Sequence, residues 1–139
     1  MARDAKEKRL QSLSLFKNAD RKAIQHLASA ADEVTVAAGH KIISEGHLHN
    51  EIYVVEHGIA VVSIEGNEVA EIPEGEIVGE LGFFVRQPAS ATVAAKTEMD
   101  VLVIPYNRFD QILDDNPQMV RAMANELAER LYNTDAKLH

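Results

Sequence analysis

The sequence contains no cysteine among its 139 residues. Disulfide bonds, thiol catalysis and metal sites with cysteine ligands are therefore excluded, and the composition fits a reducing compartment. The chain also lacks an apolar run long enough to cross a bilayer. Its charged N-terminus has none of the apolar stretch that a secretion signal needs. We therefore expect a cytoplasmic protein.

Basic residues are scarce. Lys and Arg number 14 against 22 Asp and Glu, which gives a formal net charge of −8. Nucleic-acid binding requires basic side chains that displace counterions from phosphates, and an acidic surface repels anionic membranes. The basic clusters Lys6–Arg9 and Arg21–Lys22 are interleaved with acidic residues, which is typical of solvated helix faces. We expect no direct contact with nucleic acid or membrane.

The middle of the chain is predicted to form a sheet structure. Short β-branched runs follow one another between turn residues such as Gly, Asn and Pro, a pattern that indicates an all-β barrel or jelly roll rather than alternating β-α units. The runs are Val34–Val36, Lys41–Ser44, Ile52–Glu56, Ile59–Ile64, Val69–Ile72, Thr92–Ala95 and Val101–Ile104.

The two ends of the chain are predicted to be helical. Apolar residues recur at helical spacing in Ala19–Ala31, with Asn18 or Asp20 as the N-cap. Two further helices are expected over Tyr106–Leu113 and Pro117–Tyr132, because proline suits the first turn of a helix.

The predicted fold class is mainly β with flanking helices. We expect a double-stranded β-helix, or jelly-roll β-roll, with an N-terminal helix and two C-terminal helices. The length suits a single domain over residues 1–139. Its parts would be residues 1–32 (N-terminal helical part), 33–105 (β-roll) and 106–139 (two helices).

The segment from Ile77 to Ala94 contains the groups best suited to bind a ligand. It reads I-V-G-E-L-G-F-F-V-R-Q-P-A-S-A-T-V-A. A phosphate monoanion can be held by backbone N–H groups at the start of a helix, and Gly79–Phe84 can form a short one. Gly79 lets the backbone come close to a ligand, and Ser90 can add an N–H and a hydroxyl donor. This segment therefore predicts an anion-binding loop.

This segment resembles the phosphate-binding cassette of cyclic nucleotide-binding domains. The family pattern is G-E-L, six variable positions, then P-R-A-A-T-V. The matching residues are Gly79, Glu80, Leu81, Pro88, Thr92 and Val93. Gly39–Gly58 and Gly66–Glu76 also resemble the family's early strands and the hairpin and turn that follow.

The resemblance implies a ligand-sensing regulatory module of the cyclic nucleotide-binding type, with cAMP or cGMP, or another small anion, as ligand. It implies no other cofactor. Glu80 would accept a hydrogen bond from a ribose hydroxyl. The implied ligand-binding residues are Gly79, Glu80, Leu81, Gly82, Arg86, Ala89, Ser90 and Ala91.

One position departs from the family pattern. Ala89 stands where the family has its phosphate-binding arginine. Removing one partner of a buried ion pair costs about 3–5 kcal/mol, or about two to three decades in affinity. The Glu80 carboxylate would repel the uncompensated phosphate, so weak binding of cAMP or cGMP is predicted. Arg86, three residues earlier in the loop, is the nearest substitute.

The resemblance also implies how a signal is passed on. Ligand contact at Gly79–Ser90 would shift the C-terminal helices, to the extent that the ligand favours one of their arrangements. Met119, Met123 and Leu127 would line a lid. No winged-helix DNA-binding domain follows before His139, so we expect an unidentified protein partner, a homodimer through the C-terminal helix, or a fragment of a longer protein.

Two other classes of function stay open. The first is a ligand-free interaction or dimerisation module with a vestigial pocket. The second is a cupin-type metalloenzyme, for which His47-Leu48-His49 supplies two ligands. However, Glu51 comes too soon after His49, and Val78 stands where a fourth ligand is expected. We therefore interpret His47 and His49 as residues of a surface turn, and predict no metal site.

No catalytic residues are predicted. The serines lack the context of a nucleophile elbow, and no glycine-rich phosphate loop precedes a helix. We expect a protein that is not an enzyme.

Overall fold

The computed structural model describes residues 2–138 and divides into two compact units. One unit, Ala30–Arg108, contains all the strands and is called here the β unit. The other, called the helical unit, consists of residues 2–29 and 109–138.

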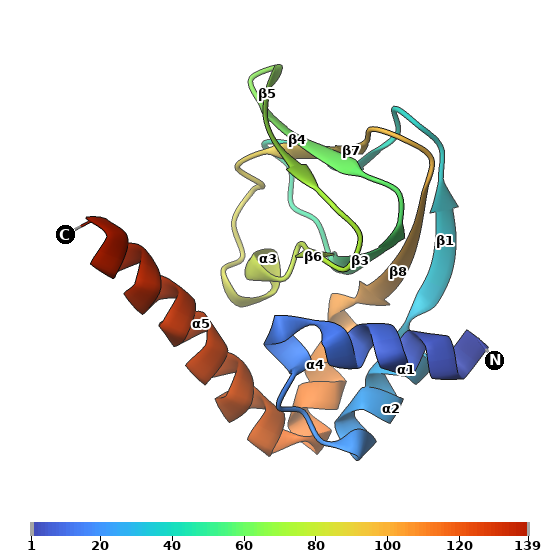
Figure 1. The fold of residues 1–139 in the computed structure, drawn as a ribbon, viewed down its shortest axis with the longest axis vertical. Helices are drawn as coiled ribbons and strands as arrows, with labels where there is room; N and C mark the ends of the chain where they lie inside the picture. Colours follow the sequence, from blue (N-terminus) through green and yellow to red (C-terminus); the bar gives the residue numbers. More distant parts are fainter. Residues whose placement is uncertain (1, 139) are drawn as a thin grey trace. The chain divides into compact units, whose positions relative to one another are not determined.

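The β unit is built from two four-stranded antiparallel sheets (Figure 1). In spatial order the first sheet contains β1 (Asp32–Val36), β8 (Met99–Pro105), β3 (Glu51–His57) and β6 (Ile77–Val78). The second contains β2 (Lys41–Ile43), β7 (Thr92–Ala95), β4 (Ala60–Ile64) and β5 (Asn67–Ile72). The chain passes between the sheets at almost every connection, so the predicted jelly-roll fold with flanking helices is confirmed.

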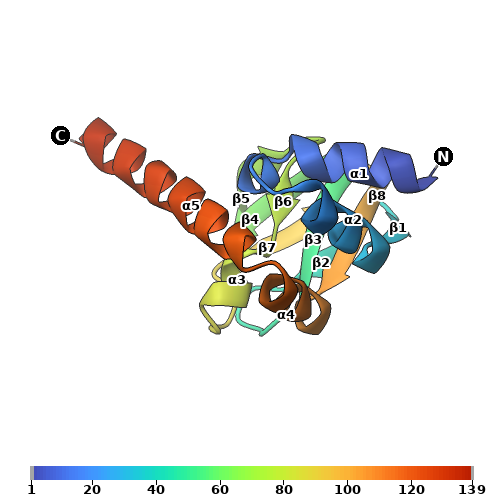
Figure 2. The same ribbon diagram turned by 90° about the horizontal axis from the view of Figure 1, so that it is seen from below.

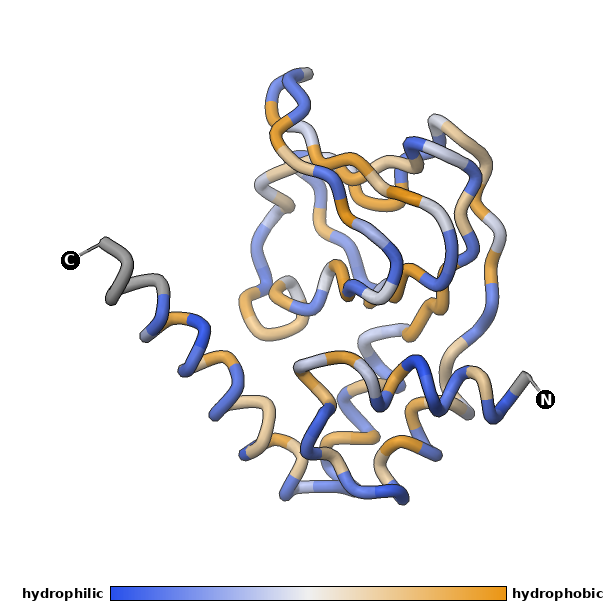
Figure 3. Tube along the Cα trace, viewed as in Figure 1, coloured by the Kyte–Doolittle hydropathy of each residue, from blue (hydrophilic) through white to orange (hydrophobic). Residues whose placement is uncertain are grey.

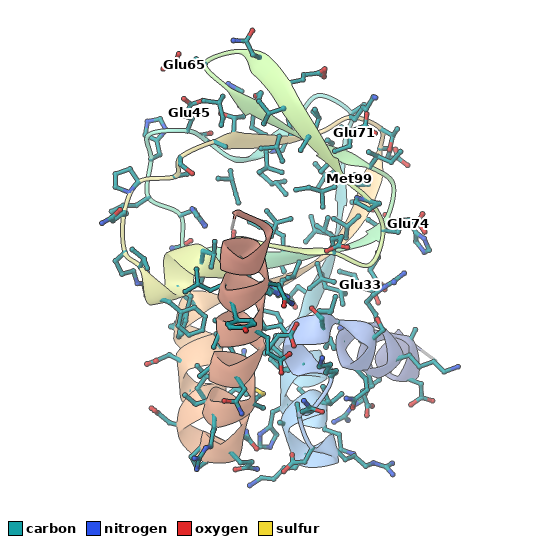
Figure 4. The ribbon with its side chains drawn as sticks, turned by 60° about the vertical axis from the view of Figure 1, so that its left-hand side comes forward. Glu33, Glu45, Glu65, Glu71, Glu74 and Met99 are labelled. Atoms are coloured by element: carbon teal, nitrogen blue, oxygen red, sulfur yellow. The ribbon has the colours of Figure 1, made fainter. Side chains whose placement is uncertain are left out.

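The core of the β unit lies between the two sheets. Because side chains alternate along a strand, each strand turns every second residue toward the opposite sheet. The buried residues are Val36, Ile43, Tyr53, Val55, Ala60, Val78, Val93, Ala95, Met99, Val101 and Val103. Figure 4 shows the acidic side chains of Glu65, Glu71 and Glu74 on the outside of the roll, whereas Met99 is buried.

The helical unit contains α1 (Ala2–Ser12), the 3-10 turn η1 (Ser14–Phe16), α2 (Arg21–Ala30) and α5 (Pro117–Leu138). It also contains most of α4 (Tyr106–Asp115), whose first residues belong to the β unit. The start of α2 is capped as predicted, because the Ala23 N–H donates to Asp20 Oδ1 at 2.9 Å. This bond and one from the Gln118 side chain, which donates to Oδ2 at 2.7 Å, lower the pKa of Asp20.

Aromatic and polar contacts hold the helical unit together. The rings of Phe16 and Phe109 lie 6.2 Å apart and both side chains are fully buried. The first half of α5 is tied to the η1 region by an ion pair of 3.1 Å between Lys17 and Glu126. Further along, the Arg130 guanidinium donates to the Ser14 hydroxyl at 2.6 Å. Figure 2 shows α5 continuing as one long helix away from α1 and α2.

The predicted boundaries need several corrections. The short helix expected over Gly79–Phe84 is α3 (Leu81–Phe84), since Gly79 has a φ of 88°, which no helix residue adopts. The last helix runs beyond the predicted Tyr132 to Leu138, and the helix predicted to end at Leu113 ends at Asp115. The two-residue strand β6 was not predicted, because so short a run has no readable periodicity.

Among the described residues, no helix combines the length and the apolar character needed to span a bilayer.

Candidate ligand-binding cavity

A cavity of about 280 Å³ opens beside α3 in the β unit. All but two of its lining residues come from the Ile77–Ala94 segment, while β2 and the loop before β3 supply one residue each. The lining residues are Ile43, His49, Gly79, Leu81, Gly82, Val85, Gln87, Pro88, Ala89, Ser90, Ala91 and Val93. The volume lies near the lower end for small-molecule pockets, about 300–1,000 Å³.

Gly79 allows the sharp turn from β6 into α3. Its φ of 88° lies in the left-handed region that side chains disfavour. A Cβ atom at this position would lie 2.9 Å from the Glu51 carbonyl oxygen and 3.3 Å from His49 Nε2. The next residue, Glu80, is buried and forms the N-cap of α3, where its carbonyl accepts the Phe83 N–H at 3.1 Å.

Gly82 leaves room for two rings that pack on α3. A Cβ atom there would lie 2.6 Å from the Tyr106 hydroxyl oxygen and 2.9 Å from His49 Cε1 and Nε2. The Tyr106 hydroxyl donates a hydrogen bond to the Gly79 carbonyl oxygen. Burial raises the pKa of Tyr106 to about 12. This tyrosine, the first residue of α4, is thus joined directly to the start of the cassette.

The Arg86 side chain stacks on the ring of Tyr106. Its guanidinium carbon lies 4.7 Å from the centroid of the Tyr106 ring, within the range of a cation–π contact. Arg86 does not belong to the cavity lining as the described residues form it. The Arg86 charge favours the ionised phenolate and so lowers the Tyr106 pKa, against the larger effect of burial.

Ala89 is held by the turn that contains His47. Its N–H donates to the His47 carbonyl at 2.9 Å, and its own carbonyl accepts the Gly46 N–H at 2.8 Å. The side chain is partly buried and packs against the core of the roll. The position that the family gives to arginine therefore contributes only a methyl group to the cavity, and its backbone N–H is already bonded.

The structure brings six of the eight predicted ligand-binding residues to the cavity lining: Gly79, Leu81, Gly82, Ala89, Ser90 and Ala91. Of the other two, Glu80 caps α3 and Arg86 stacks on Tyr106. The predicted lid residues belong to the helical unit, where Met119 and Met123 are buried and Leu127 is half-buried.

The rim of the cavity is apolar. Leu81 is 61% exposed, Phe84 42% and Val85 56%, and all three come from α3 or the residue after it. Figure 3 shows this segment as a mostly orange stretch of the tube. Such a rim offers apolar contact to a flat ligand or to a covering segment.

Sequence reasoning did not foresee a role at the site for His49 or Tyr106. It also left five lining residues out of the predicted ligand-binding set: Ile43, Val85, Gln87, Pro88 and Val93. His47 is exposed, as a surface turn predicts, but His49 is half-buried and lines the cavity. The prediction for His49 was wrong because the chain enters β3 just after this residue, which directs its ring toward Gly79 and Gly82. Within residues 2–138, no group of three or more His, Cys, Asp or Glu side chains could hold a metal ion.

A model of the cyclic nucleotide-binding domain matches residues 33–116, which include the β-roll and the cavity. The chain belongs to the cyclic nucleotide-binding domain family.

Relatives of this domain occur in proteins of several kinds. The chain is 28% identical over 120 residues to the potassium/sodium hyperpolarization-activated cyclic nucleotide-gated channel 4 of Homo sapiens, covering 86% of this chain and 10% of the channel. It is 32% identical over 103 residues to the cAMP-activated global transcriptional regulator CRP of Salmonella typhimurium, covering 70% of this chain and 49% of the regulator. The chain thus spans a tenth to a half of the length of these relatives.

Solved structures show the same fold. The N-terminal domain of a transcriptional regulator from Streptomyces coelicolor A3(2) has a TM-score of 0.81 and 28% identity, and the match covers 93% of each chain. The regulatory domain of Toxoplasma gondii PKA, crystallised with cAMP, has a TM-score of 0.75 and 24% identity. That match covers 90% of this chain and 50% of the other. At this identity the likeness to the Toxoplasma protein concerns the fold.

Proposed function

We propose that this cyclic nucleotide-binding domain is a ligand-sensing regulatory module that binds cAMP or cGMP weakly in the cavity beside α3. The observation that carries the proposal is that Gly79, Gly82, Ala89 and Ser90 of the cassette line one cavity. The family match and the cyclic nucleotides named for its relatives support the choice of ligand. The proposed role is regulation rather than catalysis.

Weak binding follows from the charges around the cavity. Among the described lining residues none is lysine or arginine, so the lining offers a phosphate no permanently charged cation. The Arg86 guanidinium lies over Tyr106 instead. Loss of a charged partner in a buried ion pair costs about 3–5 kcal/mol, or about two to three decades in affinity.

Tyr106 supports a route from ligand to helices. Its hydroxyl donates to the Gly79 carbonyl, and it is also the first residue of α4, which continues into the helical unit. A ligand that displaces Gly79 would alter this hydrogen bond and thereby the start of α4. The ligand can shift the helices only by its difference in affinity for their two arrangements.

The test is calorimetric titration of cAMP and cGMP into the wild type and the Ala89→Arg variant. We expect wild-type dissociation constants weaker than micromolar and an affinity about 100-fold higher in the variant. Micromolar or tighter binding by the wild type would contradict the weak-binding part of the proposal. Binding to neither protein would refute cyclic nucleotides as ligands.

A specific observation favours a second function, self-association through α5. Leu131 is 66% exposed and Tyr132 74% exposed, an unusual state for two large apolar side chains in neighbouring positions. A ligand-free dimerisation module would use this surface. Sedimentation velocity of the wild type and of a Leu131→Glu/Tyr132→Glu variant tests it, since only a wild-type dimer lost in the variant supports the proposal.

A further inference from the structure

His49 is a polar side chain of the cavity that the fold leaves unsatisfied. Both ring nitrogens are buried, and within the described part of the chain neither has a hydrogen-bond partner. The large majority of buried side-chain polar atoms in proteins are hydrogen-bonded. A buried polar group left without a partner destabilises the folded state. A partner from outside the chain would remove this cost, and the cavity that His49 lines can admit one.

The His49 ring is fixed at the cassette. Its Nε2 lies 3.3 Å from the Cβ position of Gly79 and 2.9 Å from that of Gly82, and its ring centroid lies 5.8 Å from that of Tyr106. The Tyr106 hydroxyl proton is already donated to the Gly79 carbonyl. The turn just before His49 is tied to Ala89 by the two backbone hydrogen bonds between residues 46–47 and 89. The backbone just before His49 is thus held beside Ala89, and both residues line the cavity.

His49 is also the one residue of the described lining whose side chain can carry a positive charge. A neutral imidazole offers one N–H donor and a protonated one offers two. Hydrogen bonds from a charged donor to an anion are roughly twice as strong as neutral ones. The chemistry that fits such a donor, in a cavity without lysine or arginine, is an acceptor-rich anionic group.

We propose that His49 contacts the ligand directly and donates a ring N–H to a phosphate oxygen of the cyclic nucleotide, which partly replaces the arginine absent at position 89. This inference rests on the proposed function. It adds a residue outside the cassette to the binding site. It also implies that the phosphate lies at the corner formed by His49, Gly79 and Ala89.

The experiment compares two ligands and four proteins by calorimetric titration at one pH. The ligands are cAMP and adenosine, which lacks the phosphate. The proteins are the wild type, His49→Ala, His49→Gln, which keeps an N–H donor, and His47→Ala as a matched control in the same turn. The titration of Ala89→Arg described above is compared with theirs. Thermal unfolding without ligand checks that each variant is folded. If His49→Ala does not fold, the comparison of His49→Gln with the wild type is the test.

We expect His49→Ala to weaken cAMP binding by about tenfold or more, the loss of a charge-assisted hydrogen bond. We expect a smaller loss in His49→Gln and less than about a twofold change in His47→Ala. Adenosine binding should change by less than about twofold in all variants, because the contact is with the phosphate.

Three results would overturn the inference. The first is cAMP binding in His49→Ala and His49→Gln equal to that of the wild type. The second is an equal loss for cAMP and adenosine, which would place His49 at the nucleoside. The third is cAMP binding by Ala89→Arg alone, which would show that the His49 side chain does not anchor the phosphate and would also remove cyclic nucleotides as ligands of the wild type. In the first two results the wild type still binds cAMP, so the proposed function survives them.

Discussion

The helical unit and the β unit each contain a half-buried histidine, His26 and His49, and the two side chains differ in what they contact. In the helical unit, His26 Nδ1 lies 3.2 Å from the side-chain amide nitrogen of Asn116, which also donates to the Ile112 carbonyl at 2.8 Å. In the β unit, neither ring nitrogen of His49 meets a partner among the described residues. A histidine bonded within the fold serves its stability, whereas one left unsatisfied in a cavity lining is free for a ligand.

The same contrast extends to the glycine and aromatic residues. Phe16 and Phe109 are fully buried against each other in the helical unit. In the β unit, Gly79 and Gly82 leave space that Tyr106 and His49 occupy, and a cavity remains beside them. The β unit therefore combines a buried core with a cavity beside α3.

The largest expected effect is a loss of stability in the helical unit. Phe109→Ala should lower the free energy of unfolding by about 3–5 kcal/mol, because it removes a fully buried ring. Urea denaturation measures the loss, and amide hydrogen exchange should show it mainly in α2, α4 and α5. Arg121→Ala, at an exposed position of the same unit, should stay within about 0.5 kcal/mol of the wild type. Equal losses in the two variants would contradict the placement of the core.

A smaller effect is expected from the cassette glycine. Gly79→Ala places a side chain at a φ of 88° and within 2.9 Å of the Glu51 carbonyl. Gly39→Ala is the matched control, since its φ is 86° but nothing lies within 4 Å of the added Cβ. Each substitution should cost about 1–3 kcal/mol of backbone strain. Urea denaturation should show a further loss only in Gly79→Ala, and identical losses would mean that the close approach to Glu51 is relieved without cost.

Loss of the α2 cap should have a milder effect. Asp20→Ala removes the acceptor of the Ala23 N–H and should lower the urea midpoint, whereas Asp20→Ser keeps a cap and should lower it less. The folded-state pKa of Asp20 is lowered, so its contribution is present above the unfolded pKa and is lost as the pH falls through the folded value. The difference between wild type and Asp20→Ala should therefore shrink below about pH 4. A difference that persists at pH 2 would refute a role for the ionised carboxylate.

The smallest effect concerns Tyr106 at alkaline pH. Its folded pKa is raised to about 12 by burial, so its contribution to stability is complete below the unfolded pKa near 10 and is lost as the pH rises through 12. Between pH 9 and 11 the urea midpoint of the wild type should fall more steeply than that of Tyr106→Phe. Parallel profiles would show that Tyr106 ionises in the folded protein as readily as in the unfolded chain.

Much of the fold could be read from local patterns. The β-branched runs between turn residues predicted seven of the eight strands within about two residues, because strand propensity and turn chemistry are local properties. Asp20 and Pro117 marked the starts of two helices for similar reasons, one as a cap and one as a first-turn residue. The cassette was recognised because Gly79, Glu80 and Leu81 match a family pattern, and the domain model that matches residues 33–116 confirms the family.

The tertiary structure alone decided which side chains meet at the cavity. The Tyr106 hydroxyl bonds to a residue 27 positions earlier, and the His49 ring packs on Gly82 from a different element. Arg86, which the sequence placed near the ligand, stacks on Tyr106, and the Ala89 N–H is bonded to the His47 carbonyl. Periodicity and motif spacing report on neighbours within a few residues, whereas these contacts exist only after the two sheets close into a roll. The sequence by itself therefore determined the strands, the caps and the cassette, while the packing of distant elements determined the chemistry that faces a ligand.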